Sequence, residues 1–101
     1  VSVEVMPEFI GGTAALMKYL SSNIKYPTIS QETGSQGKVI VQFVVDKDGT
    51  ISNPEVVRGV DPYLDKEAIR VISSMPKWTP GVQNGKKVRV KFTVPVSFRL
   101  Q

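Results

Sequence analysis

The chain has 101 residues, of which 41% are hydrophobic and 22% charged, proportions typical of one soluble globular domain. It contains neither cysteine nor histidine, which excludes disulfides, thiol catalysis, zinc sites of the usual Cys/His kind and histidine acid–base chemistry. Its net charge of +4 permits an acidic partner or nucleic acid without requiring either, and no apolar run approaches the roughly 20 residues that cross a bilayer.

Residues 1–12 are predicted to form an N-terminal arm or a short strand. Val1, Val3 and Val5 alternate with other side chains, as in a strand, before Pro7 and the Gly11-Gly12 pair break the pattern. We therefore expect the domain itself to span residues 13–101.

A first helix is predicted over residues 13–23. Thr13 is its expected N-cap, and apolar side chains recur at roughly helical spacing at Leu16, Met17, Leu20 and Ile24. Tyr26-Pro27 ends the helix, because a residue before proline is pushed away from the α conformation. The polar residues 28–36 are expected to form a connecting loop or one short turn.

A β-hairpin follows, with a turn at residues 46–49. Its first arm, residues 38–45, carries apolar side chains on both faces, which is typical of a central strand. Its second arm, residues 51–58, contains Pro54 and fewer apolar residues, so we expect an outer strand.

A second helix is predicted after Asp61 and Pro62, an N-cap followed by proline at the first helical position, and Pro76 ends it. Its apolar stripe consists of Leu64, Ala68, Val71, Ile72 and Met75. Trp78 follows between prolines and is expected to pack over the edge of the core, although a role as a partner anchor stays open.

The last strand, residues 87–100, is unusually long, because about 3.3 Å per residue gives roughly 45 Å. Every second residue is apolar: Val88, Val90, Phe92, Val94, Val96, Phe98 and Leu100. The positions between them are polar or basic, apart from Pro95. Since Pro95 has no N–H, at least one side of this strand is expected to be an open edge, which can pair with another chain.

These elements indicate an α+β fold. The most buried strand lies in the middle of a three-stranded antiparallel sheet, with the second strand on one side and the last strand on the other. Two helices then pack on one face of the sheet.

Several short motifs, in this order, resemble the C-terminal domain of the TonB energy-transducer family. The resemblance extends from about Leu16 to Leu100, and its motifs are Tyr26-Pro27, Gly37 before a Val-rich strand, Asp48-Gly49, Leu64-Asp65 with Ala68, residues 75–81, residues 83–86 and the final strand with Pro95. Residues 6–12 look like the Met-Pro-Glu-Phe-Pro-Gly-Gly lead-in of one branch of the family, with Ile10 in place of the proline.

The resemblance implies a TonB/TolA-like fold in a periplasmic interaction domain, anchored to the inner membrane by an N-terminal segment outside this chain. Such a domain couples the inner-membrane proton motive force to active import. The implied partners are TonB-dependent outer-membrane transporters, which present an extended peptide called the TonB box, and inner-membrane proton-driven motor proteins, which act through the N-terminal part. No cofactor or metal is implied.

The candidate contact residues follow from the resemblance by position. The last strand is expected to pair with the TonB box through Arg89, Val90, Lys91, Phe92, Thr93, Val94, Val96, Ser97 and Phe98. The loop after the first helix is expected to contact the transporter through Asn23, Lys25, Tyr26 and Pro27.

Other functions are compatible with this sequence to different degrees. The same fold can serve as a sensory or scaffold domain on another membrane protein, such as a signalling peptidase, and a long strand edge also allows a homodimer. Nucleic-acid binding is not expected, because Phe92 and Phe98 share the apolar face and leave no aromatic side chain for base stacking on the basic face. An enzyme is not expected either, since no nucleophile–base pair or phosphate-cradling glycine loop is present.

Overall fold

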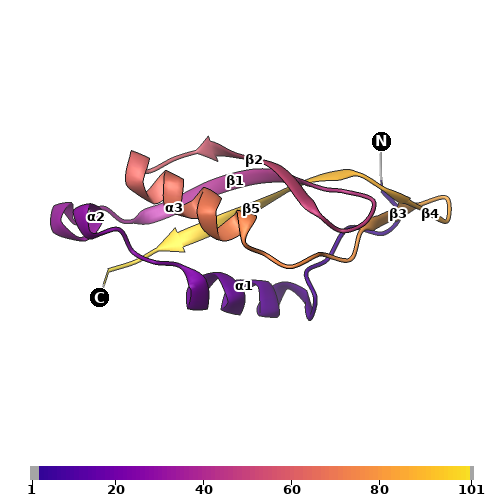
Figure 1. Ribbon diagram of the computed structural model, residues 1–101, viewed down its shortest axis with the longest axis horizontal. Coiled ribbons are helices and arrows are strands. Elements are labelled where there is room, and N and C mark those ends of the chain that lie inside the picture. The colour runs from indigo at the N-terminus through magenta and orange to yellow at the C-terminus, as the bar shows by residue number, and fades with distance from the viewer. Residues whose placement is uncertain (1–2, 101) are drawn as a thin grey trace.

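The centre of the fold is strand β1 (Gly37–Val45), which lies in a three-stranded antiparallel sheet in the computed structural model, where residues 3–100 are described. β2 (Ile51–Arg58) pairs with one side of β1 and β5 (Val90–Phe98) with the other, as Figure 1 shows. This order confirms the predicted sheet and the α+β fold. The predicted alternation at Val1 lies outside the described residues.

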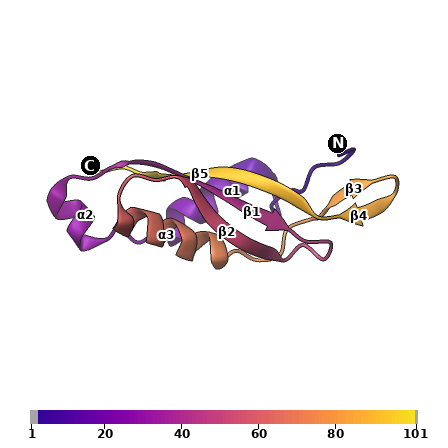
Figure 2. The same cartoon turned by 90° about the horizontal axis from the view of Figure 1, so that it is seen from above.

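Within the described part of the chain there are three helices: α1 (Gly12–Asn23), α2 (Thr28–Thr33) and α3 (Pro62–Ser73). Figures 1 and 2 show α1 on the β5 side of the molecule and α3 on the β2 side. The apolar stripes of α1 and α3 and the inner face of the sheet enclose the core, whose most buried members include Val39, Val41, Phe43, Val45, Leu64, Ala68, Val71 and Ile72.

The beginning of α3 and the position of Trp78 confirm two predictions. Asp61 Oδ1 accepts the backbone N–H of Leu64 at 2.7 Å, and Pro62 occupies the first turn. Trp78 is only 3% exposed and packs edge-on against aromatic rings whose centroids lie 5.8, 5.3 and 5.2 Å away, those of Phe9, Phe43 and Phe92. Its indole therefore closes one end of the core.

The predicted N-cap of the first helix is wrong. α1 begins at Gly12, its N-cap is Gly11 with φ 91°, and no side chain caps it. The N–H of Gly12 instead donates to the carbonyl of Phe9 at 2.8 Å. A left-handed backbone at Gly11 lets the arm turn sharply into the helix, which glycine permits without steric cost.

α2 corrects the loop or single turn predicted over residues 28–36, so the two predicted helices become three. Ser30 is fully buried, and its hydroxyl donates to Asp61 Oδ2 at 3.0 Å, which holds α2 against the start of α3. Gly34, with φ 72°, ends the helix. A six-residue helix is too short to show an apolar stripe, so its formation depends on these tertiary contacts.

The prediction of one strand over residues 87–100 is also wrong, because the strand is divided at Arg89. β4 (Lys86–Val88) pairs back onto β3 (Gly81–Gln83) around the predicted turn at Asn84-Gly85, and this hairpin extends from one end of the molecule (Figure 1). The Arg89 side chain reaches the β1–β2 turn, with Nε 2.7 Å from Asp46 Oδ1. Apolar alternation continues across the division, so periodicity alone could not reveal it.

The N-terminal arm is fastened to the end of the domain that carries the β3–β4 hairpin. Val5 and Val82 exchange backbone hydrogen bonds of 3.0 and 2.9 Å, and Glu8 and Thr79 exchange bonds of 3.0 and 2.8 Å. Phe9, only 6% exposed, then enters the core. The arm thus lies next to the first residues of β5, and this position shapes the site described below.

Candidate functional site

The candidate site is the open edge of β5. Nine consecutive residue pairs join β5 to β1, from Val45 opposite Val90 to Gly37 opposite Phe98, without a register shift. Among residues 3–100, no strand pairs with the other side of β5. A row of backbone N–H and C=O groups is therefore free to pair with a further strand.

The position of Pro95 shows which backbone groups this edge presents. Pro95 lies opposite Ile40 of β1. The N–H of Asp46, the residue that follows β1, donates to the carbonyl of Thr50 at 2.9 Å, on the side where β2 lies. Because the backbone groups of successive strand residues point alternately to opposite sides, the even-numbered residues of β1 direct theirs toward β2. Ile40 is one of these residues, so its backbone groups do not bond to Pro95. Pro95 consequently faces the open edge, together with Lys91, Thr93 and Ser97.

The same alternation divides the side chains of β5 between two faces. The side chains of Lys91, Thr93 and Ser97 are exposed on the outer face of the sheet. On the inner face Phe92 is half-buried, and the remaining side chains are buried in the core: Val90, Val94, Val96 and Phe98. The free edge thus offers N–H and C=O groups from three residues and only a C=O group from Pro95. Arg89 lies outside β5 and pairs with Asp46 instead.

The predicted loop contact lies at the other end of β5. The ring of Tyr26 packs edge-on against that of Phe98, with centroids 5.7 Å apart, and its hydroxyl donates to the carbonyl of Ser35. Burial, and secondarily the nearby Asp61 carboxylate, raise the pKa of Tyr26. Pro27 then forms the N-cap of α2. The structure therefore places Tyr26 of the predicted loop beside Phe98 at the end of β5, whereas Asn23 and Lys25 lie against α3.

A buried carboxylate holds this loop in place. Glu67 is 9% exposed, and its Oε2 accepts the backbone N–H of Lys25 at 2.6 Å. Arg70 donates to both carboxylate oxygens of Glu67 at 2.7 Å and to the carbonyl of Asn23 at 2.9 Å. Burial acts to raise the pKa of Glu67, but the hydrogen bonds from Arg70 and Lys25 outweigh it and lower that pKa. The carboxylate is therefore a charged anchor between α1, the loop and α3.

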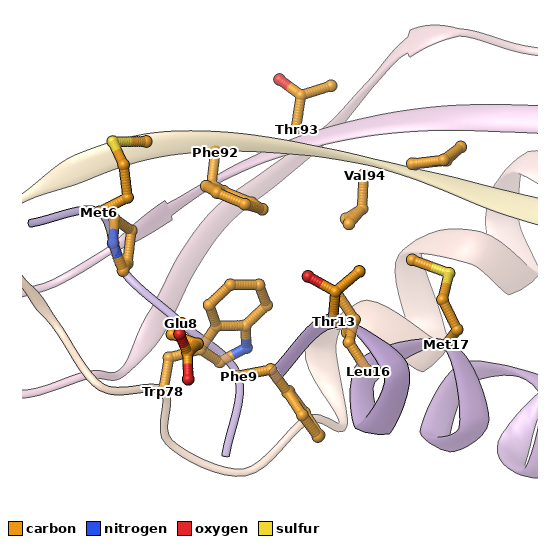
Figure 3. A pocket seen from close by; sticks show the side chains of 12 residues that line it. Met6, Glu8, Phe9, Thr13, Leu16, Met17, Trp78, Phe92, Thr93 and Val94 are labelled. Carbon is orange, nitrogen blue, oxygen red and sulfur yellow. The ribbon is translucent and has the colours of Figure 1, made fainter. Parts of the chain in front are cut away.

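A pocket of about 400 Å³ lies beside the open edge, between β5, α1 and the N-terminal arm. In Figure 3, Trp78 lies below Phe92 and Val94, and Met6 and Met17 lie at opposite sides. The indole N–H of Trp78 is buried and has no hydrogen-bond partner among the described residues. The sequence alone does not predict this pocket, because it depends on where the arm lies. Its signal in the sequence is limited to the two flexible apolar side chains of Met6 and Met17.

The described residues show no features of a metal centre or a membrane span. No group of three or more His, Cys, Asp or Glu side chains in residues 3–100 is arranged to hold a metal ion. None of the helices formed by these residues has the length and apolar character needed to cross a membrane.

Comparison with known proteins agrees with this architecture. Residues 22–100 match the family described as Gram-negative bacterial TonB protein C-terminal. Protein TonB of Haemophilus influenzae is 33% identical over 85 residues, and the match covers 80% of this chain and 32% of that protein. Protein TonB of Helicobacter pylori is 26% identical over 83 residues, and the match covers 81% of this chain and 28% of that protein. The chain thus spans about a third of the length of these curated relatives.

The fold is also similar to that of solved structures. Two NMR structures of the C-terminal domain of Helicobacter pylori TonB match with TM-scores of 0.65 and 0.57, at 24% identity. The matches cover 85% of this chain and 90% and 79% of those chains. The fold, the family match and the relatives agree, and the chain belongs to the TonB C-terminal family.

Proposed function

We propose that this chain is the periplasmic interaction domain of an energy transducer, and that the open edge of β5 takes up the TonB box of an outer-membrane transporter as a fourth strand. The observation that carries the proposal is that no strand formed by residues 3–100 pairs with the outer edge of β5, which is nine residues long. An extended peptide is the ligand that satisfies alternating N–H and C=O groups along a strand.

Strand addition suits this role energetically. Each backbone hydrogen bond contributes a net ~1 kcal/mol, and the cost of association offsets part of the total. Because backbone groups are common to all sequences, one edge can serve more than one transporter. Force along paired strands loads many hydrogen bonds together, and this would let the edge hold its partner while the proton motive force is converted to import.

The second part of the proposed interface is the loop formed by Asn23, Lys25, Tyr26 and Pro27. Tyr26 supports this assignment because it packs against Phe98, at the end of β5, and Glu67 fixes the loop backbone at Lys25. A transporter segment that continues beyond the added strand would then meet this loop. Inner-membrane motor proteins would act through an N-terminal anchor and linker, which would join the domain at the arm that precedes α1.

Peptide titration tests the proposal. Peptides from the N-terminal ends of candidate transporters are added to the isotope-labelled chain, and amide shifts are followed by NMR. We expect the largest shifts at residues 90–98 and smaller ones at residues 23–27. Shifts confined to β2, or none at millimolar peptide, would refute strand addition here.

A pair of variants separates backbone pairing from side-chain contact. Thr93→Pro removes an outward N–H and places a proline ring on the edge, so peptide affinity should fall by roughly tenfold or more. Thr93→Val keeps the N–H and should bind as the parent chain does. The amide spectrum of β1 serves to check that both variants retain the sheet. Equal binding by the two variants would argue against pairing at this edge.

A further inference from the structure

We infer that the pocket between β5, α1 and the arm receives one apolar side chain of the added strand, so that the edge selects a residue pattern and not only a backbone. The inference rests on the proposed strand addition. It assigns a specificity site to Met6, Met17 and Trp78, which lie outside both predicted groups of contact residues.

Sheet geometry determines which partner residues reach the pocket. Side chains at neighbouring positions of paired strands point to the same face of the sheet. Phe92 and Val94 point to the helix-covered face and line the pocket, together with Leu16 of α1. A partner residue beside either of them therefore points into the pocket, while its neighbours beside Lys91, Thr93 and Pro95 point to the outer face.

The pocket walls favour an aliphatic occupant. Met6 and Met17 are 51% and 40% exposed on opposite sides of the opening, and Trp78 is buried below (Figure 3). Methionine side chains are flexible and polarisable, so they can close around an inserted side chain of irregular shape. Glu8 is the one charged residue among those that line the pocket, and it repels an acidic occupant. The exposed apolar surface would be buried once a strand is added.

The arm closes the pocket at the end where β5 begins. A Cβ atom at Gly81 would lie 2.8 Å from the side chain of Val90, 3.1 Å from the carbonyl of Val5 and 3.3 Å from Pro7. The arm, β3 and the start of β5 are thus in close contact, and Met6 lies in this part of the arm and lines the pocket. This contact fixes where an added strand can place its inward side chain along β5.

The outer face adds a charge preference. Lys91 is exposed on β5, and Lys38 is exposed on β1 opposite Ser97. An acidic partner residue beside Lys91 would form a favourable cross-strand pair. The preferred ligand is therefore an extended peptide that alternates acidic or polar residues with apolar ones, with a leucine-like side chain beside Phe92 or Val94.

Two designed ten-residue peptides test the inference. They share outward Glu and Thr residues and differ at one central inward position, which is Leu in one and Asp in the other. Burial of the leucine side chain should make the first peptide bind roughly tenfold tighter or more, as measured by calorimetry. Intermolecular NOEs should connect its Leu methyls to the methyls of Met6 and Met17.

Protein variants provide the matched control. Met17→Lys places a charge at the pocket opening without breaking α1, since lysine is a good helix former. The variant should weaken binding of the Leu peptide about tenfold and strengthen binding of the Asp peptide. Val57→Lys makes the same change at a 51% exposed residue of β2, the opposite edge, and should leave both peptides unaffected.

The outcomes distinguish the inference from the function on which it rests. If both peptides bind equally and shift the β5 amides, the edge pairs through its backbone alone and the pocket assignment is wrong. If neither peptide shifts those amides, strand addition fails as well. If sedimentation shows a dimer that excludes the peptide from β5, a second copy of the chain is the occupant and the inference is overturned.

Discussion

Pro95 of β5 lies opposite Ile40 of β1, at a position where β1 directs its backbone groups toward β2. The missing N–H of Pro95 therefore interrupts the free edge and leaves the internal ladder intact. Proline at a sheet edge limits edge-to-edge association between copies of a chain. In this domain the same residue also fixes one position at which an added strand receives no hydrogen bond from β5.

Pro95→Thr tests this orientation. The new amide should face solvent, so it should exchange hydrogen rapidly in the free monomer, and the free energy of unfolding should change by no more than about 1 kcal/mol. A transporter peptide should protect that amide and bind a few-fold more tightly, because it gains one backbone hydrogen bond.

Hydrogen exchange by NMR measures the protection, and sedimentation detects any increase in self-association. A slowly exchanging amide at position 95 in the free monomer would mean that this position faces β1 and not the open edge. Thr93→Val, which leaves the backbone unchanged, provides the baseline for both measurements.

Gly49 joins the β1–β2 turn to the segment that carries Trp78. Its carbonyl accepts the N–H of Trp78 at 2.8 Å, and a Cβ atom at this position would lie only 2.0 Å from the carbonyl oxygen of Trp78. Gly49→Ala must therefore displace the Trp78 backbone, in addition to the cost of alanine at φ +88°. We expect a loss of roughly 3 kcal/mol or more in the free energy of unfolding.

Gly85→Ala is the matched control for this prediction. Gly85 has a similar φ of +73°, but nothing lies within 4 Å of the added Cβ. Only the backbone cost of about 1–2 kcal/mol should remain. Urea denaturation of the two variants gives the difference, and equal losses would show that the contact between Gly49 and Trp78 does not constrain the fold.

The predictable part of the fold is the part in which local pattern and tertiary structure agree. Apolar periodicity, turn residues and the cap at Asp61 predict β1, β2 and α3. The division at Arg89 was not predictable, because Val88 and Val90 keep the alternation while their strands pair with different neighbours. The pocket was not predictable either, since it requires Met6 of the arm and Met17 of α1 to lie on opposite sides of a space beside β5.

Glu67→Ala tests whether the buried carboxylate positions the Tyr26 loop. The variant leaves the N–H of Lys25 and the guanidinium of Arg70 without their acceptor, so the free energy of unfolding should fall by about 1–3 kcal/mol. The resonances of Tyr26 and Phe98 should shift, because the loop loses its attachment to α3. Glu55→Ala removes an exposed carboxylate on β2 and should have little effect. Unchanged Tyr26 resonances in the Glu67 variant would contradict this positioning role.

Asp61 should make the stability of the domain depend on pH below about 4, the ordinary pKa range of aspartate. The backbone N–H of Leu64 and the hydroxyl of Ser30 donate to its carboxylate and lower the pKa of Asp61. A lowered pKa in the folded state means that the stabilisation is present above the unfolded-state value and is lost as pH falls through the folded-state value.

Asp61→Asn isolates this contribution, because asparagine keeps an N-cap acceptor but does not titrate. The free energy of unfolding, measured in urea at pH 6 and pH 3, should fall more steeply with acid in the parent chain than in the variant. Glu67 and Asp48 also have lowered pKa values and titrate in both proteins, so the variant should keep part of the acid dependence. Parallel losses in the two proteins would show that ionised Asp61 contributes no more than a neutral cap, and that the contact between α2 and α3 does not depend on its charge.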